Sequence, residues 1–152
     1  MNIEDYELTR VILAQDWNVY HWIRREELFR TLGMVETYNY KHPDEVKSGN
    51  FPLLLKFNGY SIGTVRIDLK NDGEAVIRLL AITKTEQSKG HGKILMKKIE
   101  TFARTKKVKK LLVNARKDAV GYYQKNDFVF EDWDTNELVG ISIDSIQMSK
   151  VI

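Results

Sequence analysis

Cysteine is absent from this chain, and its absence removes several kinds of chemistry at once. Without a thiol there is no disulfide, no thiolate ligand for a metal ion and no cysteine nucleophile. A reducing compartment, the cytoplasm, is the location that this composition favours. Histidine is scarce too, and His21, His42 and His91 do not have the spacing of a metal site, so we expect no bound metal.

Long apolar runs and a strong charge excess are also missing. No run approaches the roughly 20 residues that cross a bilayer, and residues 1–5 lack the apolar core of a signal peptide, so we expect no membrane association. The excess of +3 is too small to indicate nucleic-acid binding. Four lysines do cluster at positions 106, 107, 109 and 110, but cations there suit the C-terminus of the preceding helix, which favours a solvated surface.

The remaining composition is that of a compact globular protein. Its 152 residues are 43% hydrophobic and 30% charged, which predicts a single domain over residues 1–152 with a substantial core. Strand and helix patterns follow one another in the order βαβββαβαββ. This order predicts an α/β fold (α+β mixed sheet) with a central mixed sheet of about seven strands and helices on both faces.

Apolar runs bounded by turn residues give the expected strands: residues 6–12, 51–57, 60–69, 74–82, 111–115, 128–133 and 141–148. A first helix is expected from Asp16, as N-cap, to Phe29 or Leu32, where Gly33 would end it. A second helix follows the glycine loop, and a short third helix precedes residue 128. Because a helix connects strands 74–82 and 111–115, these two strands should be parallel.

Three turn signals set the strand pairing. Asn58-Gly59 is the strongest hairpin signal, and Asn71-Asp72-Gly73 predicts the next turn. The stretch from Asp134 to Glu137 predicts a hairpin between the last two strands. No repeat, low-complexity tract or linker interrupts this succession.

The junction from Gln87 to Lys93 is the most informative feature that is present. Gly90 and Gly92 lack a Cβ, so the chain can adopt positive φ there and come close to a ligand. The first N–H groups of the following helix have no intrahelical partner, and the helix dipole favours an anion at that end. The string predicts a pyrophosphate site, although a glycine-rich turn between a strand and a helix would have the same pattern.

Two further elements lie downstream, and with the loop they occur in the order and spacing of a known family. The chain resembles the GNAT superfamily of acetyl-CoA-dependent N-acetyltransferases, which shows an R/Q-x-x-G-x-G/A loop, an Asn ending the next strand and an A-x-x-F/Y-Y-x-K-x-G-F segment. The matching residues are Gln87, Gly90, Gly92, Asn114, Ala119, Tyr122, Tyr123, Lys125 and Phe128. Asp127 replaces the family glycine, and Asp tolerates the left-handed conformation at modest cost.

Weaker matches extend the resemblance to both ends of the chain. Residues 23–29, 63–66 and 140–148 are similar to the I-R-x-x-V-F, G-T-x-R and G-I-x-H-x-x-M strings of the ElaA-like branch, with Asp144 in place of the histidine.

The resemblance implies transfer of an acetyl group from acetyl-CoA to a primary amine by direct attack in a ternary complex. It assigns the general acid to Tyr123, whose phenol would protonate the departing CoA thiolate. The residues implied in CoA binding are Leu80, Ala81 and Ile82 through their backbone, Gln87, Ser88, Lys89, Gly90, His91, Gly92 and Lys93 around the pyrophosphate, and Asn114, Ala119, Tyr122 and Lys125 near the thioester. The alternative for Tyr123 is a non-catalytic role, in which its ring packs on the helix or only touches the cofactor.

The general base is left open. Many members of the family place a Glu in the strand before the loop, where this chain has Arg78. The residues Asp68, Glu74, Glu26 and Glu27 are unranked candidates, and each has surface charge as its ordinary role. His91 is a weak candidate, because its backbone N–H suits the phosphate better than its ring suits a base.

The acceptor, a small-molecule amine or a protein amine, is not identified by the sequence. Because many members of the family are dimers, a homodimer is compatible with the resemblance. Two other functions compete with the enzyme. A non-catalytic acyl-CoA-binding module would keep the loop without an acceptor site, and a nucleic-acid-binding protein would use the lysine cluster and lose its affinity steeply with salt.

Overall fold

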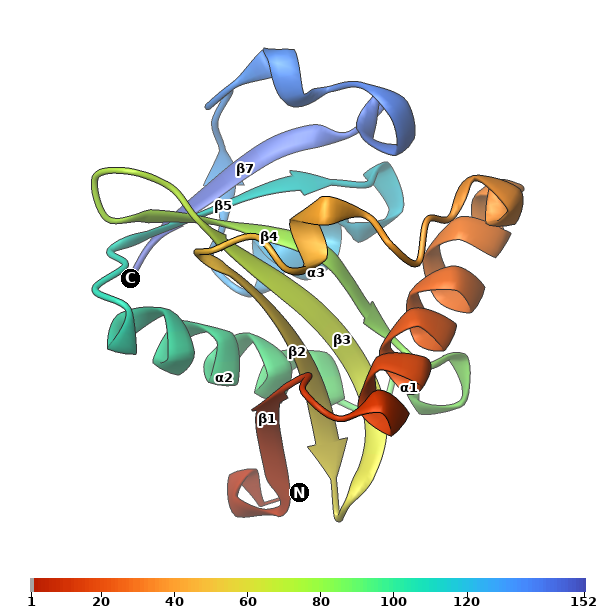
Figure 1. Ribbon diagram of the computed structural model, residues 1–152. Coiled ribbons are helices and arrows are strands. Elements are labelled where there is room, and N and C mark those ends of the chain that lie inside the picture. Colours follow the sequence, from red (N-terminus) through yellow and green to blue (C-terminus); the bar gives the residue numbers. More distant parts are fainter. Residues whose placement is uncertain (1) are drawn as a thin grey trace.

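The computed structural model describes residues 2–152, and Met1 lies outside the described residues. Seven strands form one mixed sheet in the order β1-β2-β3-β4-β5-β7-β6 (Figure 1). The strands are β1 (Tyr6–Arg10), β2 (Asn50–Phe57), β3 (Tyr60–Leu69), β4 (Glu74–Ile82), β5 (Lys110–Ala115), β6 (Val129–Phe130) and β7 (Ile146–Val151). The α-helices are α1 (Ala14–Arg24), α2 (His91–Thr105) and α3 (Val120–Lys125). The expected order βαβββαβαββ is confirmed.

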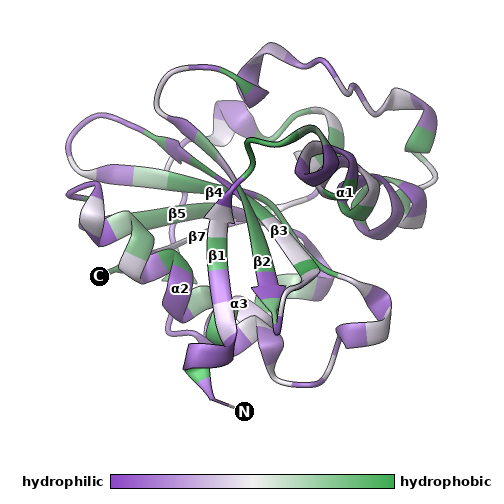
Figure 2. Ribbon diagram, turned by 60° about the horizontal axis from the view of Figure 1, so that its bottom comes forward, coloured by the Kyte–Doolittle hydropathy of each residue, from purple (hydrophilic) through white to green (hydrophobic). Residues whose placement is uncertain are grey.

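Helices cover both faces of the sheet. Successive residues of a strand point to opposite sides, so the apolar residues of the central strands need helices to cover them on each face. Leu53 and Leu55 of β2 belong to the large core beneath α2 and α3, whereas Leu54 between them packs with residues of α1. Figure 2 shows the hydrophobic colour running along the central strands, with hydrophilic residues on the outer sides of the helices. The core therefore lies on both sides of the sheet.

The predicted turns before the glycine loop are confirmed. Asn58 and Gly59 have φ of 48° and 84°, the left-handed pair that a tight hairpin between β2 and β3 requires. Asp72 and Gly73, with φ of 64° and 73°, make the next turn. Strand β5 is parallel to β4, as the intervening helix requires.

The expected start of the first helix is wrong. Helix α1 begins at Ala14, and its N-cap is Leu13, whose carbonyl accepts from the N–H groups of Asp16 and Trp17. Asp16 lies in the first turn of α1, where a carboxylate is also favoured by the positive end of the helix dipole. The sequence therefore does not distinguish an aspartate at the N-cap from one in the first turn. Gly33, with φ of 67°, ends the helical stretch as predicted.

Between α1 and Gly33 the helix changes its geometry. Residues Arg25–Phe29 form a π-helical turn, and Arg30–Leu32 form a 3-10 turn. Further 3-10 turns cover Ile3–Asp5, Val35–Thr37, Pro43–Glu45, Lys84–Glu86, Lys117–Ala119, Thr135–Glu137 and Gly140–Ser142. π-Helical turns occur often at functional sites, and this one carries Leu28 into the cavity described below.

The expected C-terminal hairpin is wrong in its bounds. Strand β6 has two residues, β7 begins at Ile146, and residues 131–145 form a long β6–β7 connection. Asp134 caps a 3-10 turn by accepting from the N–H of Asn136, and Gly140 turns the chain with φ of 59°. The polar residues that suggested one tight turn therefore start a helical turn instead.

Candidate active site

The parallel strands β4 and β5 part in the middle of the sheet. Their ladder ends with the pair Ile77 and Val113. Beyond this point Arg78–Ile82 pair only with β3, and Asn114 and Ala115 pair only with β7. The side of β4 that faces β5 is thus open over its last residues, and a chain of matching length can bond there as an added strand.

A bulge in β4 accompanies the parting of the strands. Arg78 pairs with Arg66 and Ala81 with Thr64, so three steps along β4 match two along β3. Leu79, inside the bulge, has φ of 51°, which is rare for a leucine. Bulges bend a strand and cluster near active sites, so this one explains how β4 turns away from β5.

A cavity of about 390 Å³ lies in this split. Residues of β4, β5, α3 and the β6–β7 connection surround it. Its lining residues are Leu28, Asp44, Arg66, Ile77, Arg78, Leu79, Leu80, Val113, Asn114, Arg116, Ala119, Tyr123, Glu137, Val139, Ile141, Ser142 and Ser145. Tyr123 packs in the core beneath α2, whereas Arg78 bonds Asp68 and Glu137. Residues from both faces of the sheet therefore line the cavity.

The glycine loop ends β4 and leads into α2. Ser88 and Gly90 have φ of 62° and 86°, and no side chain caps the start of the helix at His91. Within residues 2–152, no backbone carbonyl accepts from the N–H groups of residues 88–90. These groups and the first turn of α2 can therefore bind a phosphate by backbone alone.

The side chains of the loop are used differently from its backbone. Gln87 Nε2 donates to the carbonyl of Ile82 at 2.9 Å, and Lys89 forms an ion pair with Glu86 at 2.7 Å. His91 is buried, and its Nδ1 lies 2.8 Å from the hydroxyl of Tyr6. A histidine packed into the core in this way does not reach the cavity, so its ring is not the base. Lys93 is exposed on the first turn of α2.

The expected role of Gly92 needs correction. Gly92 has no positive φ and lies inside α2. A Cβ on it would lie 2.8 Å from Cε1 of Tyr122, whose hydroxyl donates to the Gly92 carbonyl at 2.6 Å. The second glycine of the motif thus makes room for the ring of Tyr122 from α3. Because this ring is buried, the pKa of the Tyr122 phenol is raised.

Replacing Gly92 with alanine is expected to lower the free energy of unfolding by about 1–3 kcal/mol, because the new methyl group overpacks against the Tyr122 ring. Urea unfolding measures this change. Gly121→Ala is the matched control, since no atom lies within 4 Å of a Cβ there. A Gly92→Ala protein as stable as the Gly121→Ala protein would contradict the packing role.

Tyr123 reaches the cavity from α3. Its side chain is 5% exposed, and no residue from 2 to 152 bonds its hydroxyl. Burial raises the pKa of Tyr123, so the phenol is protonated at neutral pH. Ala119 lines the cavity beside it. Lys125 is exposed and does not line the cavity. Asp127 has φ of 68°, which is the left-handed conformation expected for this position.

Asn114 also lines the cavity, but its amide is already bonded within the protein. Its Oδ1 accepts from Gln147 Nε2 at 2.9 Å, and its Nδ2 donates to Glu137 Oε1 at 3.2 Å. These bonds connect β5 to β7 and to the β6–β7 connection. They fix the orientation of the amide against the open side of β4.

A chain of ion pairs borders the cavity on the side of α1. Arg66 is its centre: it donates from Nε and Nη2 to Asp68 at 2.7 and 2.9 Å, and from Nη1 to Glu45 at 2.7 Å. Arg24 also bonds Glu45, at 2.6 Å, and Arg78 connects Asp68 to Glu137. Burial disfavours the charged form of Glu45, but the two arginines outweigh it and lower the pKa of that carboxyl.

None of the carboxylates that the sequence suggested as bases lines the cavity. Glu74 lies at the opposite end of β4, Glu26 is paired with Arg30, and Asp68 is buried between two arginines. Glu27 lies 3.3 Å from Gln87. Among the described residues the lining carboxylates are Asp44 and Glu137. Neither has a recognisable signal in the sequence, because both lie in turn-like segments of irregular structure.

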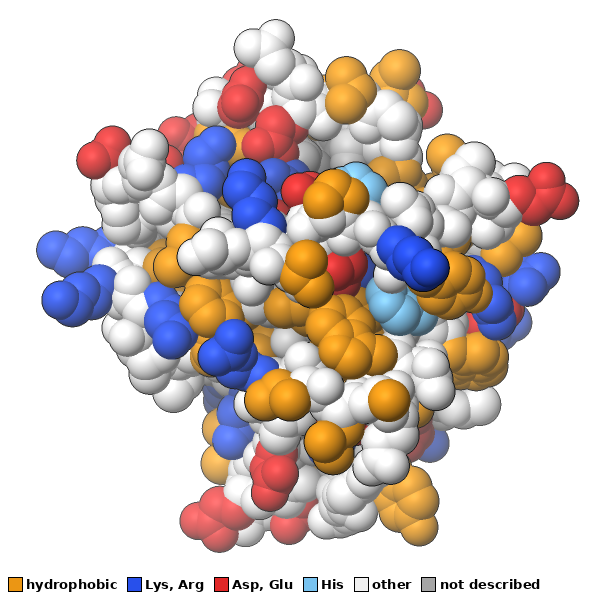
Figure 3. All heavy atoms as spheres, in the orientation of Figure 1, with side chains coloured by type: hydrophobic (Ala, Val, Ile, Leu, Met, Phe, Trp, Pro, Cys, Tyr) orange, Lys and Arg blue, Asp and Glu red, His pale blue; other side chains and the backbone are white. Residues whose placement is uncertain are grey.

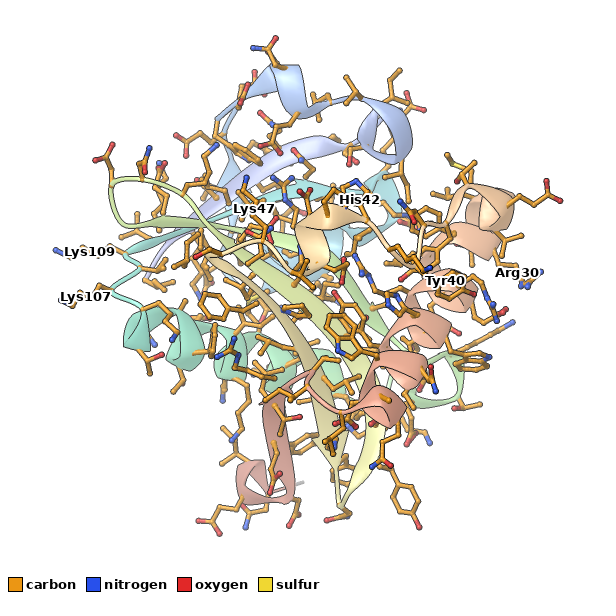
Figure 4. The ribbon with its side chains drawn as sticks, in the orientation of Figure 1. Arg30, Tyr40, His42, Lys47, Lys107 and Lys109 are labelled. Atoms are coloured by element: carbon orange, nitrogen blue, oxygen red, sulfur yellow. The ribbon has the colours of Figure 1, made fainter. Side chains whose placement is uncertain are left out.

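The lysine cluster lies away from the cavity. Lys107 and Lys109 point outward at the edge of the molecule, whereas His42 and Lys47 lie on residues 38–49, the segment that crosses in front of the sheet (Figure 4). Lys106 lies over the rings of Phe51 and Phe102, and Lys110 pairs with Glu131. On the face in Figure 3, basic side chains are scattered among acidic and hydrophobic ones.

Two other kinds of site are absent from the described part of the chain. Residues 2–152 contain no group of three or more His, Cys, Asp or Glu side chains placed to hold a metal ion. No helix within the same range has the length and apolar character needed to cross a membrane.

Comparisons with known proteins agree with this geometry. The family described as acetyltransferase (GNAT) domain matches residues 21–152. A GNAT-family acetyltransferase of Staphylococcus aureus Mu50 superposes with a TM-score of 0.75 at 12% identity, covering 96% of this chain and 98% of that one. The PaiA N-acetyltransferase of Thermoplasma acidophilum, solved with coenzyme A, gives 0.75 at 19%, covering 97% and 99%. A chimeric spermidine N-acetyltransferase SpeG of Vibrio cholerae gives 0.73 at 15%, covering 97% and 95%.

Proposed function

Because this chain belongs to the GNAT family of acetyltransferases, we propose that it moves the acetyl group of acetyl-CoA to a primary amine by direct attack within a ternary complex. The observation that carries this proposal is the open side of β4 beyond Ile77, which faces a cavity containing Tyr123. The pantetheine arm of acetyl-CoA can lie along β4, while the acceptor amine enters the cavity from the opposite face of the sheet.

Two parts of acetyl-CoA, the pantetheine arm and the pyrophosphate, have candidate binding groups in this chain. Backbone groups at Leu80 and Ala81 lie where a pantetheine arm can bond as an added strand, while the Ile82 carbonyl is already bonded to Gln87. The N–H groups of the glycine loop suit the pyrophosphate. When bound, acetyl-CoA supplies the activated acyl group, and the protein binds and orients it.

Tyr123 is the group that we assign to the departing thiolate. Its hydroxyl has no bond within residues 2–152 and is protonated at neutral pH, so it can donate a hydrogen bond and then its proton. Burial raises the pKa of a phenol, but the same apolar surroundings also raise the pKa of the thiol that forms, which keeps the transfer feasible.

The acceptor is a primary amine, small or carried by a protein. It enters from the side of the sheet that bears Asp44, Arg66 and Glu137, opposite the core around Tyr123. An alkyl ammonium of pKa about 10.4 needs about 4 kcal/mol to lose its proton at neutral pH, and the open cavity lets that proton leave to solvent. The neighbour that acts on spermidine makes a polyamine one reasonable first acceptor to try.

Release of free CoA from acetyl-CoA tests the proposal, with spermidine, glucosamine, L-glutamate and a lysine peptide as acceptors. A thiol reagent suits this chain, which has no cysteine of its own. We expect release that depends on one class of acceptor. Binding of acetyl-CoA in a calorimeter without release of CoA for any amine would favour the non-catalytic binding module. No binding of acetyl-CoA would exclude both the enzyme and the binding module.

A further inference from the structure

The side chain of Glu137 lies at the apex of the split between β4 and β5. The parallel ladder ends at Ile77 and Val113, so Arg78 and Asn114 are the first residues on either strand that have no partner across the gap. Both of them donate to the same oxygen, Glu137 Oε1, from Arg78 Nη1 at 2.5 Å and Asn114 Nδ2 at 3.2 Å. One carboxylate oxygen thus bridges the two strands where they separate.

The second oxygen of Glu137 is less occupied. It accepts from Arg78 Nη2 at 3.1 Å, and Lys70 Nζ lies 3.9 Å away, which is beyond hydrogen-bond distance. A carboxylate has about four acceptor positions, and three are filled by these donors. The side chain is 21% exposed and lines the cavity, so the remaining position is accessible from the cavity.

The state of this carboxylate excludes a role as general base. Burial disfavours its charge, but the bonds from Arg78 and Asn114 outweigh burial and lower the pKa of Glu137. Because the pKa of Glu137 is lowered, this carboxylate is a weaker acceptor of a proton from an ammonium than an ordinary glutamate is, and loss of that proton to water at neutral pH is the easier route. Glu137 remains an anion and can act only as a hydrogen-bond acceptor.

We propose that Glu137 binds the acceptor amine, taking a hydrogen bond from it through Oε2 and holding it at the apex of the cleft, with Arg78 and Asn114 as positioning residues. This inference rests on the proposed function. It restricts the acceptors to amines slender enough to reach the apex between Arg78 and the β6–β7 connection, and it favours cationic amines over neutral ones in the binding step.

The reaction balances with Glu137 unchanged throughout. The ammonium loses one proton to water, and the free amine keeps an N–H bonded to Glu137. Its lone pair forms the new N–C bond, the C–S bond breaks, the sulfur takes the proton of Tyr123, and the second amine proton leaves to water. Tyr123 regains its proton from solvent.

Asp44 is the competing carboxylate in the cavity. Its side chain is 43% exposed, and its contact with Arg66 is 3.8 Å long. It comes from the 3-10 turn Pro43–Glu45, and within residues 2–152 its side chain forms no hydrogen bond with Arg78 or Asn114, the residues where β4 and β5 part. A carboxylate that is this exposed discriminates between amines weakly, because water screens its charge.

Kinetics of Glu137→Gln test the assignment, with the amine that the wild-type protein acetylates best as acceptor. We expect the KM for this amine to rise about 10- to 100-fold, as for the loss of one hydrogen bond to a charged group, while kcat and the Kd of acetyl-CoA change less than about threefold. Glu131→Gln is the matched control on the same connection, because Glu131 pairs with Lys110 outside the cavity. A larger rise in KM for Asp44→Asn than for Glu137→Gln would overturn the assignment.

A double variant separates amine binding from a purely structural ion pair. Glu137→Gln with Arg78→Gln leaves no unpaired charge at the apex. If Glu137 binds the amine, KM stays raised in the double variant; if Glu137 only neutralises Arg78, KM returns to the wild-type value and the inference fails. In that case wild-type acetylation still stands, whereas a wild-type protein that acetylates no amine would end the proposed function and this inference together.

Discussion

Replacing Tyr123 with phenylalanine is expected to lower the turnover of acetyl transfer by about 10²- to 10⁴-fold, which is the usual contribution of a proton donor. The change removes one oxygen that has no bond within residues 2–152 and leaves the packing of the ring in the core unchanged. Both the stability and the affinity for acetyl-CoA should therefore stay close to those of the wild-type protein.

Steady-state rates of CoA release and calorimetric binding of acetyl-CoA measure the two effects separately. Tyr60→Phe is the control, because Tyr60 is 77% exposed in the hairpin between β2 and β3. Unchanged turnover in Tyr123→Phe, with normal binding, would sink the assignment of Tyr123 as general acid and leave it as a packing residue.

Replacing Arg66 with methionine is expected to lower the free energy of unfolding by about 3–5 kcal/mol, because it breaks a buried ion pair from one side. Arg66 is 6% exposed and makes three bonds to Asp68 and Glu45, which are themselves buried. Without it, two carboxylates lose their best donors in a place where water does not replace them. Arg24 and Arg78 keep one bond each to this pair, which places the effect at the lower end of the range.

Urea unfolding followed by circular dichroism gives this free energy. Arg104→Met is the matched control, since Arg104 is 54% exposed and its ion pair with Glu100 on α2 is worth at most about 1 kcal/mol. A loss in Arg66→Met no greater than that in Arg104→Met would show that the buried chain of ion pairs does not stabilise the fold.

The sequence predicts the elements of this fold well where local signals are strong. Asn58-Gly59 and the glycine loop have turn chemistry that few other structures satisfy, and the structure has the expected turns there. Gly33 is an equally clear signal for the end of the first helix, and it lies there in the structure. The parallel arrangement of β4 and β5 follows from the helix between them. Tyr123 and Asn114 are expected near the thioester from the resemblance to the family, and both line the cavity.

The sequence fails where the deciding interaction is not local. The role of Gly92 is set by Tyr122, a residue 30 positions away. The Asp134–Glu137 stretch has the composition of a hairpin turn, and only the contacts of Glu137 with Arg78 of β4 and Asn114 of β5 show that it lies at the cavity. A charged side chain in a loop gives no sequence signal of burial, so the side of the cavity that we propose for the acceptor could not be predicted.

Acetyl transfer itself is the most direct test of the central claim. Acetyl-CoA with an isotopically labelled acetyl group is incubated with the wild-type protein and each amine of the panel, and mass spectrometry follows the label while the thiol reagent follows free CoA. We predict one labelled acetyl group on the nitrogen of a primary amine for each CoA released. Free CoA without a labelled amine, or no release with any amine despite bound acetyl-CoA, would contradict the account.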